Sequence, residues 1–168
     1  MEPKILISAC LLGQPVRYNG KGLHLESTIV QRWQQQDRLV ALCPEVAAGF
    51  PTPRPPAEIE PGKSANEVLI GTGKIFENSG ADVSEGFRAG AMIAVDTASA
   101  HNCKFALLTD GSPSCGSSFI YSGTHNGEKR SGSGVVAAAL SDAGVEIFAQ
   151  HQIKMLAERL AQHTSETG

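Results

Sequence analysis

The chain has 168 residues, which is the length of a single domain. It carries 14 Lys and Arg against 17 Asp and Glu, a net charge of −3, so a cationic protein that coats nucleic acid is excluded and no large nucleic-acid footprint is expected. Hydrophobic residues make up 41% of the sequence, enough to build a core. No apolar run approaches the roughly 18 residues of a membrane span, and the first residues lack the pattern of a signal peptide. We therefore expect a cytoplasmic protein without a membrane partner.

Short apolar runs alternate with amphipathic segments along the chain. In chain order, the first half predicts a strand at 5–8, a helix at 28–36 capped by Ser27, a strand at 38–43, a proline-rich loop at 50–61, and a hairpin of 67–70 with 74–76. The second half predicts a helix at 85–101 capped by Ser84, a strand at 104–108, a helix at 135–140, a strand at 145–148, and a helix at 152–162.

This alternation of strands and helices predicts an α/β fold. We expect a Rossmann-like, open and mainly parallel sheet with helices on both faces, and the small hairpin as an insertion. The whole of 1–163 is expected to form one domain, with 164–168 as a flexible tail.

Three of the four cysteines share one topological position. Cys10 follows the first predicted strand, Cys43 ends the second, and Cys115 lies in the loop after the third. Ligands of open α/β sheets bind at the carboxyl ends of the strands, so these thiols are expected to meet at one edge. Cys103 precedes its strand and is expected at the opposite edge, about 15–20 Å away. Any one cysteine could still be a buried apolar residue, and this interpretation is favoured for Cys103.

Three converging thiolates suit more than one inorganic centre. No Cys-x-x-Cys pair is present, so a zinc ribbon or a thioredoxin-like redox pair is not indicated. A cubane iron–sulfur cluster held by three cysteines would keep one iron open, whereas zinc would need a fourth ligand. His24, His101 and His125 are the candidates for that ligand. A zinc protein and a non-catalytic cluster carrier or sensor are therefore the alternatives to an iron–sulfur enzyme.

Four blocks of the sequence together resemble the thiouracil desulfidases, a family of small bacterial proteins. The blocks are 8–13 with 16–20, 43–46 with 49–56, 112–116, and 132–140, and the resemblance extends over nearly the whole chain. The resemblance implies a [4Fe–4S] cluster held by Cys10, Cys43 and Cys115. It also implies removal of sulfur from a thiolated pyrimidine, without net redox change, to give the oxo-pyrimidine and sulfide. The substrate can be a free base, a nucleoside or a tRNA nucleotide.

Polar residues beside the cysteines are the candidates for the remaining roles. Glu45 follows Cys43 by two positions and is a candidate general acid or base, a role that the resemblance also implies. Ser112 is our second catalytic candidate, because its hydroxyl can orient water. The residues expected to contact a flat heterocycle or support its loop are Arg17, Tyr18, Asn19 and Ser114. Arg54, in the proline-rich loop, is expected to brace carboxylates.

Overall fold

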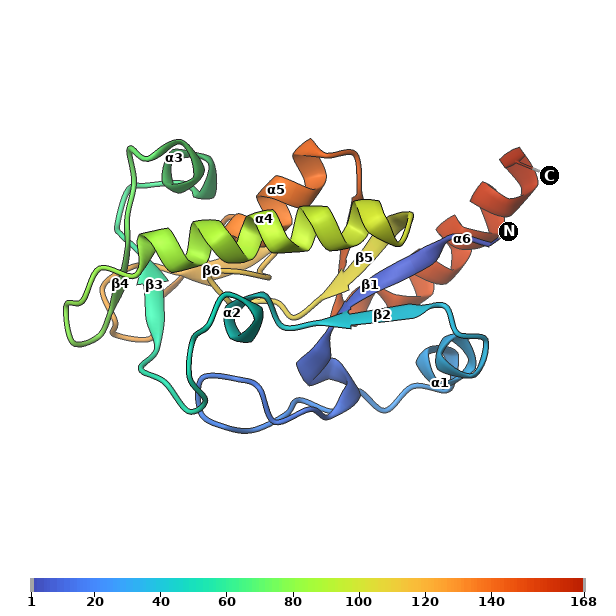
Figure 1. Ribbon diagram of the computed structural model, residues 1–168, viewed down its shortest axis with the longest axis horizontal. Helices are drawn as coiled ribbons and strands as arrows, with labels where there is room; N and C mark the ends of the chain where they lie inside the picture. The colour runs from blue at the N-terminus through green and yellow to red at the C-terminus, as the bar shows by residue number, and fades with distance from the viewer. Residues whose placement is uncertain (1, 168) are drawn as a thin grey trace.

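The computed structural model describes residues 2–167 and has a four-stranded parallel sheet at its centre (Figure 1). The strands are β1 (Lys4–Ser8), β2 (Leu39–Leu42), β5 (Cys103–Leu108) and β8 (Glu146–Ala149), in the order β2-β1-β5-β8. All neighbouring pairs are parallel. The four strands predicted from the sequence are confirmed to within one residue at each end.

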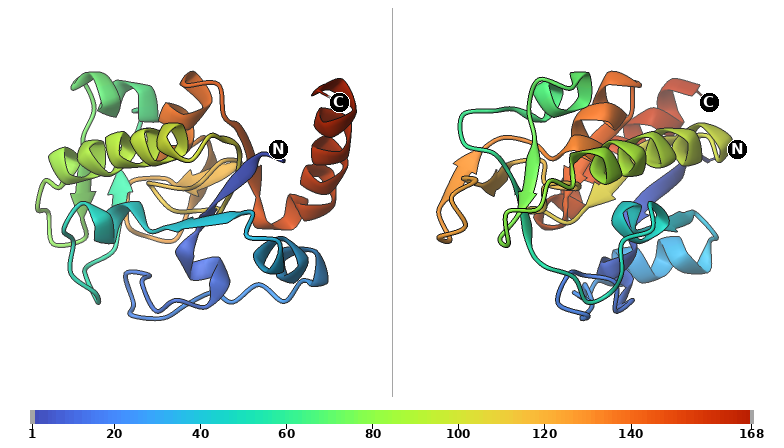
Figure 2. Two further views of the ribbon diagram at one scale, coloured as in Figure 1. Left: turned by 45° about the vertical axis from the view of Figure 1, so that its right-hand side comes forward. Right: turned by 60° about the vertical axis from the view of Figure 1, so that its left-hand side comes forward.

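Helices cover both faces of this sheet, as predicted (Figures 1 and 2). Successive side chains of a strand point to opposite faces. Ile5 and Ile7 thus share a core with α1 (Thr28–Gln35) and α6 (Ile153–Thr167). Leu6 shares the other core with α4 (Ser84–Ala100) and α5 (Val135–Asp142). The prediction of a Rossmann-like α/β fold is confirmed.

Two small antiparallel sheets lie beyond the carboxyl ends of the central strands (Figure 1). One pairs β3 (Ala57–Ile59) with β4 (Ile75–Glu77), and the other pairs β6 (Phe119–Tyr121) with β7 (Lys129–Ser131). The sequence predicted neither pair. The segment 50–61, expected to be loop throughout, contains β3.

The prediction of a hairpin around Gly71 is wrong. Residues 67–70 belong instead to a short helix, α3 (Ala65–Ile70). The Ser64 hydroxyl accepts a hydrogen bond from the Glu67 backbone N–H, and the Glu67 carboxylate accepts one from the Ser64 N–H. This capping box starts a helix where the short apolar run alone favoured a strand.

Two helix ends also differ from expectation. Val83 caps α4, and Ser84 is its first residue; the Ser84 hydroxyl accepts a hydrogen bond from the Ile75 backbone N–H at 2.8 Å. Helix α6 runs to Thr167, so residues 164–167 of the expected tail are helical, and Gly168 lies outside the described residues. Within residues 2–167, no helix combines the length and apolar character needed to cross a bilayer.

Candidate functional site: a cavity at the carboxyl edge of the sheet

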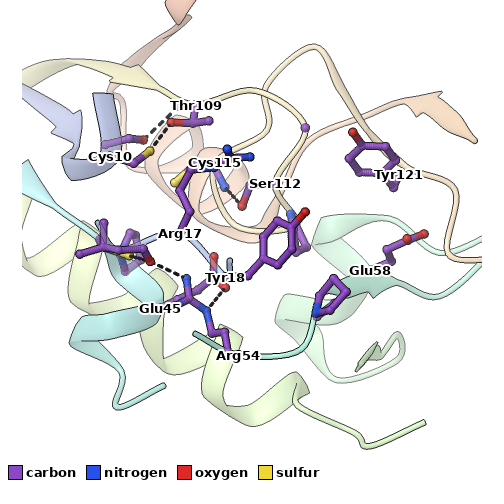
Figure 3. Close-up of a pocket in the computed structure, with 18 of the residues that line it drawn as sticks. Cys10, Arg17, Tyr18, Glu45, Arg54, Glu58, Thr109, Ser112, Cys115 and Tyr121 are labelled. Atoms are coloured by element: carbon purple, nitrogen blue, oxygen red, sulfur yellow. Dashed lines mark hydrogen bonds and ion pairs between the residues drawn. The ribbon is translucent and has the colours of Figure 1, made fainter. Parts of the chain in front are cut away.

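Three thiols line one cavity of about 410 Å³ at the carboxyl edge of the sheet (Figure 3). Cys10 lies in a 3₁₀ turn (Ala9–Leu12) that follows β1, and Cys43 caps the short helix α2 (Pro44–Ala47) that follows β2. Cys115 lies in the loop after β5. All three are free thiols. The structure thus brings together the three cysteines that the strand ends had singled out.

Cys103 lies at the other edge, as expected. It pairs with Lys4 at the start of β1, and burial raises the pKa of its thiol to about 11. It does not line the cavity. It is therefore a buried apolar residue.

The environment of the cavity thiols suits a positively charged inorganic centre. Burial raises the pKa of the Cys10 and Cys115 thiols, and the neighbouring cysteines raise that of Cys115 further. The Cys10 sulfur also lies 2.9 Å from the Thr109 hydroxyl oxygen. Buried thiolates that share one cavity repel one another unless a cationic centre binds them, so the donor set fits a metal cluster.

A single metal ion fits these three thiols less well. In the described part of the chain, no three His, Cys, Asp or Glu side chains converge on a point where one ion could bind. Of the three histidines considered as a fourth zinc ligand, His125 lines the cavity, whereas His24 and His101 do not. Because a cluster binds each thiolate through a different iron, it suits thiols that are spread around a cavity better than tetrahedral zinc does.

Glu45 projects into the cavity from α2, beside the cysteines. Its Oε1 accepts a hydrogen bond from Arg54 Nε at 3.1 Å, and its Oε2 accepts one from the Ser114 hydroxyl at 3.2 Å. The side chain is 17% exposed. Both carboxylate oxygens are thus held in place while the group stays open to the cavity.

Arg54 braces this carboxylate, as the sequence predicted. Its side chain is 5% exposed. Besides Glu45, the guanidinium donates to Val16 O at 2.9 Å, and to Pro51 O and Thr52 Oγ1. One buried cation therefore ties Glu45 to the proline-rich loop and to the loop that follows Cys10.

The two candidate serines have different surroundings. Ser112 lines the cavity, and its hydroxyl oxygen accepts hydrogen bonds from the backbone N–H groups of Ser114 and Cys115, at 3.0 and 3.2 Å. Its own proton is thus left to donate into the cavity. Ser114 is buried and does not line the cavity; its hydroxyl donates to Glu45.

The loop after Cys10 contributes two of its three predicted contact residues. Arg17 and Tyr18 line the cavity, and the Arg17 guanidinium lies 5.9 Å from the centroid of the Tyr18 ring. Asn19 does not line it; its side-chain oxygen accepts a hydrogen bond from the Lys21 N–H within a turn. The three cysteines, Glu45, Ser112, Arg17 and Tyr18 form what we call the inner wall.

The opposite side of the cavity is lined by residues that the sequence did not join into a site; His125 had been considered there only as a zinc ligand. This outer wall comprises Glu58, Asn78, Tyr121, His125 and Gly127. Figure 3 shows Glu58 and Tyr121 across the cavity from Cys10 and Thr109. This wall depends on the two small sheets. Because neither sheet was predicted, nothing in the sequence indicated that these residues lie together.

Comparison with known proteins agrees with this architecture. Residues 5–152 match the family described as 2-thiouracil desulfurase. An uncharacterised protein of Bacillus subtilis (strain 168), YbbK, is 43% identical over 149 residues, which are 89% of this chain and 97% of the relative. The solved structure of the [4Fe-4S]-dependent thiouracil desulfidase TudS superposes with a TM-score of 0.88 at 41% identity, covering 96% of this chain and 99% of that one. The chain therefore belongs to the 2-thiouracil desulfurase family.

Proposed function

We propose that the protein is an iron–sulfur enzyme that converts a thiolated pyrimidine, such as 2-thiouracil, into the oxo-pyrimidine and sulfide. The observation that carries the proposal is the meeting of three thiols and a braced carboxylate on one cavity. The solved relative TudS, named as a [4Fe-4S]-dependent thiouracil desulfidase, supports both the cofactor and the substrate class.

Cys10, Cys43 and Cys115 would hold the cluster, because each follows a strand of the central sheet and lines the cavity. When bound, a cluster with three cysteine ligands supplies an open iron that acts as a Lewis acid towards the sulfur of the substrate. A substrate bound in this way has its sulfur at the inner wall. Its ring would then lie beside Tyr18, whose own ring Figure 3 shows between Arg17 and Glu58.

Glu45 is the group that would move the proton. A water molecule attacks the ring carbon that carries sulfur, and Glu45 takes its proton as the new C–O bond forms. The C–S bond then breaks, its electron pair leaves with sulfur, and the protons end on the released sulfide. The balance is C=S plus H₂O giving C=O plus H₂S, so no external electron donor is needed.

The neighbouring side chains would orient the reacting groups. Arg54 and Ser114 fix the two oxygens of Glu45, so the carboxylate keeps its direction while it exchanges a proton. Ser112 can donate its free proton to the attacking water or to the ring. Arg17 and Tyr18 present two flat surfaces to a planar heterocycle.

The test is anaerobic reconstitution with iron and sulfide, followed by incubation with 2-thiouracil. We expect uracil and sulfide to appear in equal amounts without an added reductant, and Cys103→Ala to behave as the wild type. Zinc in place of iron, or an assembled cluster without sulfide release, would contradict the proposal. The first result would favour a zinc protein, and the second a carrier or sensor.

A further inference from the structure

We propose that Glu58 and His125 form a recognition pair for the pyrimidine ring. In this pair, His125 contacts the ring edge remote from the departing sulfur, and Glu58 is a positioning residue that orients the imidazole. The inference rests on the proposed function, which places the sulfur at the inner wall and so turns the opposite ring edge towards the outer wall.

The carboxylate of Glu58 contacts the β6–β7 turn that carries His125. Its Oε1 accepts hydrogen bonds from the backbone N–H groups of Gly123 and His125, at 2.8 and 3.3 Å. Its Oε2 lies 3.4 Å from Nδ1 of His125. The two side chains are 11% and 22% exposed, so a largely buried carboxylate faces a largely buried imidazole on the cavity surface.

The imidazole is not fully satisfied by these contacts. Nδ1 of His125 is buried and makes no hydrogen bond within the described residues; its contact with Glu58 is an ion-pair distance without hydrogen-bond geometry. Burying a polar nitrogen in this state costs free energy. A ligand that moves the ring slightly would align Nδ1 with Glu58 and recover that cost.

The turn itself is shaped to bring His125 to this place. Gly123 has a φ of 101°, and a Cβ there would lie 2.5 Å from Ile59 O, so the turn packs directly on β3. His125 has a φ of 57°, in the left-handed region that few non-glycine residues adopt. Arg130 donates to Glu60 O at 3.2 Å and ties β7 to the same segment. The turn therefore holds His125 against β3 and beside Glu58.

The chemistry of imidazole matches the edge of a pyrimidine. With Nδ1 directed at Glu58, Nε2 is the ring nitrogen left for a ligand. A pyrimidine edge carries N–H donors and carbonyl acceptors, and Nε2 can pair with either according to its protonation. Once a ligand has aligned Nδ1 with Glu58, the carboxylate would hold the imidazole plane, so the pair would select one orientation of the substrate.

The decisive variant is His125→Asn, because asparagine tolerates the left-handed backbone and can place its amide where Nδ1 lies, but lacks Nε2. We expect the KM for 2-thiouracil and the inhibition constant of uracil to rise together by about 5–100-fold, with kcat changed less than about 3-fold. Iron content should equal that of the wild type. His125→Gln, whose amide reaches the place of Nε2, should recover part of the loss.

Glu58→Gln is the matched variant for the positioning role, since its amide oxygen can still accept from Gly123 and His125. We expect the same two constants to rise, but less than in His125→Asn. The exposed His151, changed to Gln, is the control and should leave every constant unchanged.

Unchanged KM and uracil inhibition in His125→Asn would overturn the inference, as would loss of iron from that variant, which would make the wall a structural support. Failure of the proposed function gives a different result, namely no sulfide release from the wild type. In that case calorimetric titration with uracil still tests the recognition role of Glu58 and His125. Equal affinity of the wild type and His125→Asn for uracil would contradict that role, and weaker binding to the variant would support it.

Discussion

The two walls of the cavity are built by different means. Strands β1, β2 and β5 are hydrogen-bonded neighbours, so their shared edge fixes the cysteines of the inner wall. The outer wall stands on two small antiparallel sheets joined by side-chain contacts, among them those of Glu58 and Arg130 to the backbone. The cysteines thus lie in turns and loops directly supported by the central sheet, whereas the residues that we propose to contact the far edge of the ring lie on the small added sheets and their turns. Changes to the inner wall should stop the reaction, whereas changes to the outer wall should alter substrate affinity.

The largest effect is expected from the inner-wall thiols. Replacing Cys10, Cys43 or Cys115 by Ala removes one of three ligands, and each variant should lose most of its iron and its sulfide release. Cys103→Ala, at the opposite edge of the sheet, should keep its full iron content. Iron and sulfide analysis of the purified variants is the measurement. Iron lost from Cys103→Ala but retained in Cys10→Ala would show that the sheet edge does not form the centre.

Glu45→Gln separates the chemistry of the inner wall from its assembly. The substitution keeps the shape of the side chain but removes its ability to exchange protons. We expect kcat to fall by about 10²–10⁴-fold, the usual contribution of a general acid or base, with iron content unchanged. Steady-state kinetics of sulfide release measure this. Turnover near the wild-type value would remove Glu45 from the mechanism, and loss of iron would make it a structural residue.

Arg54→Lys tests whether the brace on Glu45 matters. Lysine keeps the charge but cannot donate at once to Glu45, Val16 O and Pro51 O. We expect kcat to fall about 10-fold and the free energy of unfolding to drop by about 2 kcal/mol, because buried acceptors lose their donor. Urea denaturation and kinetics of the same preparations give the two values. A variant with lower stability and unchanged kcat would limit Arg54 to a structural role.

The smallest effect concerns the loop that links the two walls. Asp110 Oδ1 accepts hydrogen bonds from the N–H groups of Gly111, Ser117, Ser118 and Phe119. Burial alone would raise the pKa of Asp110, but hydrogen bonds from the Ser118 hydroxyl and from backbone N–H groups outweigh it and lower the pKa below 3.8. A carboxyl whose pKa is lowered by folding stabilises the folded state above its unfolded pKa, and this stabilisation is lost as the pH falls through the folded pKa.

Asp110→Asn removes this pH dependence. We expect the wild type to be more stable than the variant at pH 7, and the difference to shrink as the pH is lowered towards 3. Urea denaturation of both proteins across that range is the measurement. A stability difference that does not vary with pH would show that the charge of Asp110 does not hold the loop.

The difference between the inner and the outer wall also explains which parts of the site could be predicted from the sequence. The central strands are short apolar runs with clear ends, so the convergence of Cys10, Cys43 and Cys115 followed from topology alone. Arg54 was expected to brace carboxylates from its place in the proline-rich loop, and the structure shows that the carboxylate is that of Glu45. Ser114, expected near the substrate, instead supports Glu45, since a contact between residues 69 positions apart in the chain leaves no local pattern.

The outer wall could not be predicted for a physical reason. Strands of three residues, such as β3 and β6, are too short to show an alternating pattern, and proline-rich flanks mask β3. Their pairing depends on tertiary contacts such as those of Glu58 with Gly123. The contact of Glu58 with His125 is therefore visible in the structure and not in either segment alone.

The central claim is that the sulfur of the substrate meets an iron centre at the inner wall. Its most direct test is the electronic or Mössbauer spectrum of the reconstituted protein, recorded with 2-thiouracil and with uracil, which share a ring but differ in the atom offered to the iron. We predict that 2-thiouracil changes the spectrum of the cluster and that uracil binds more weakly and leaves it unchanged. Equal binding of both pyrimidines with no spectral change in either case would contradict the account.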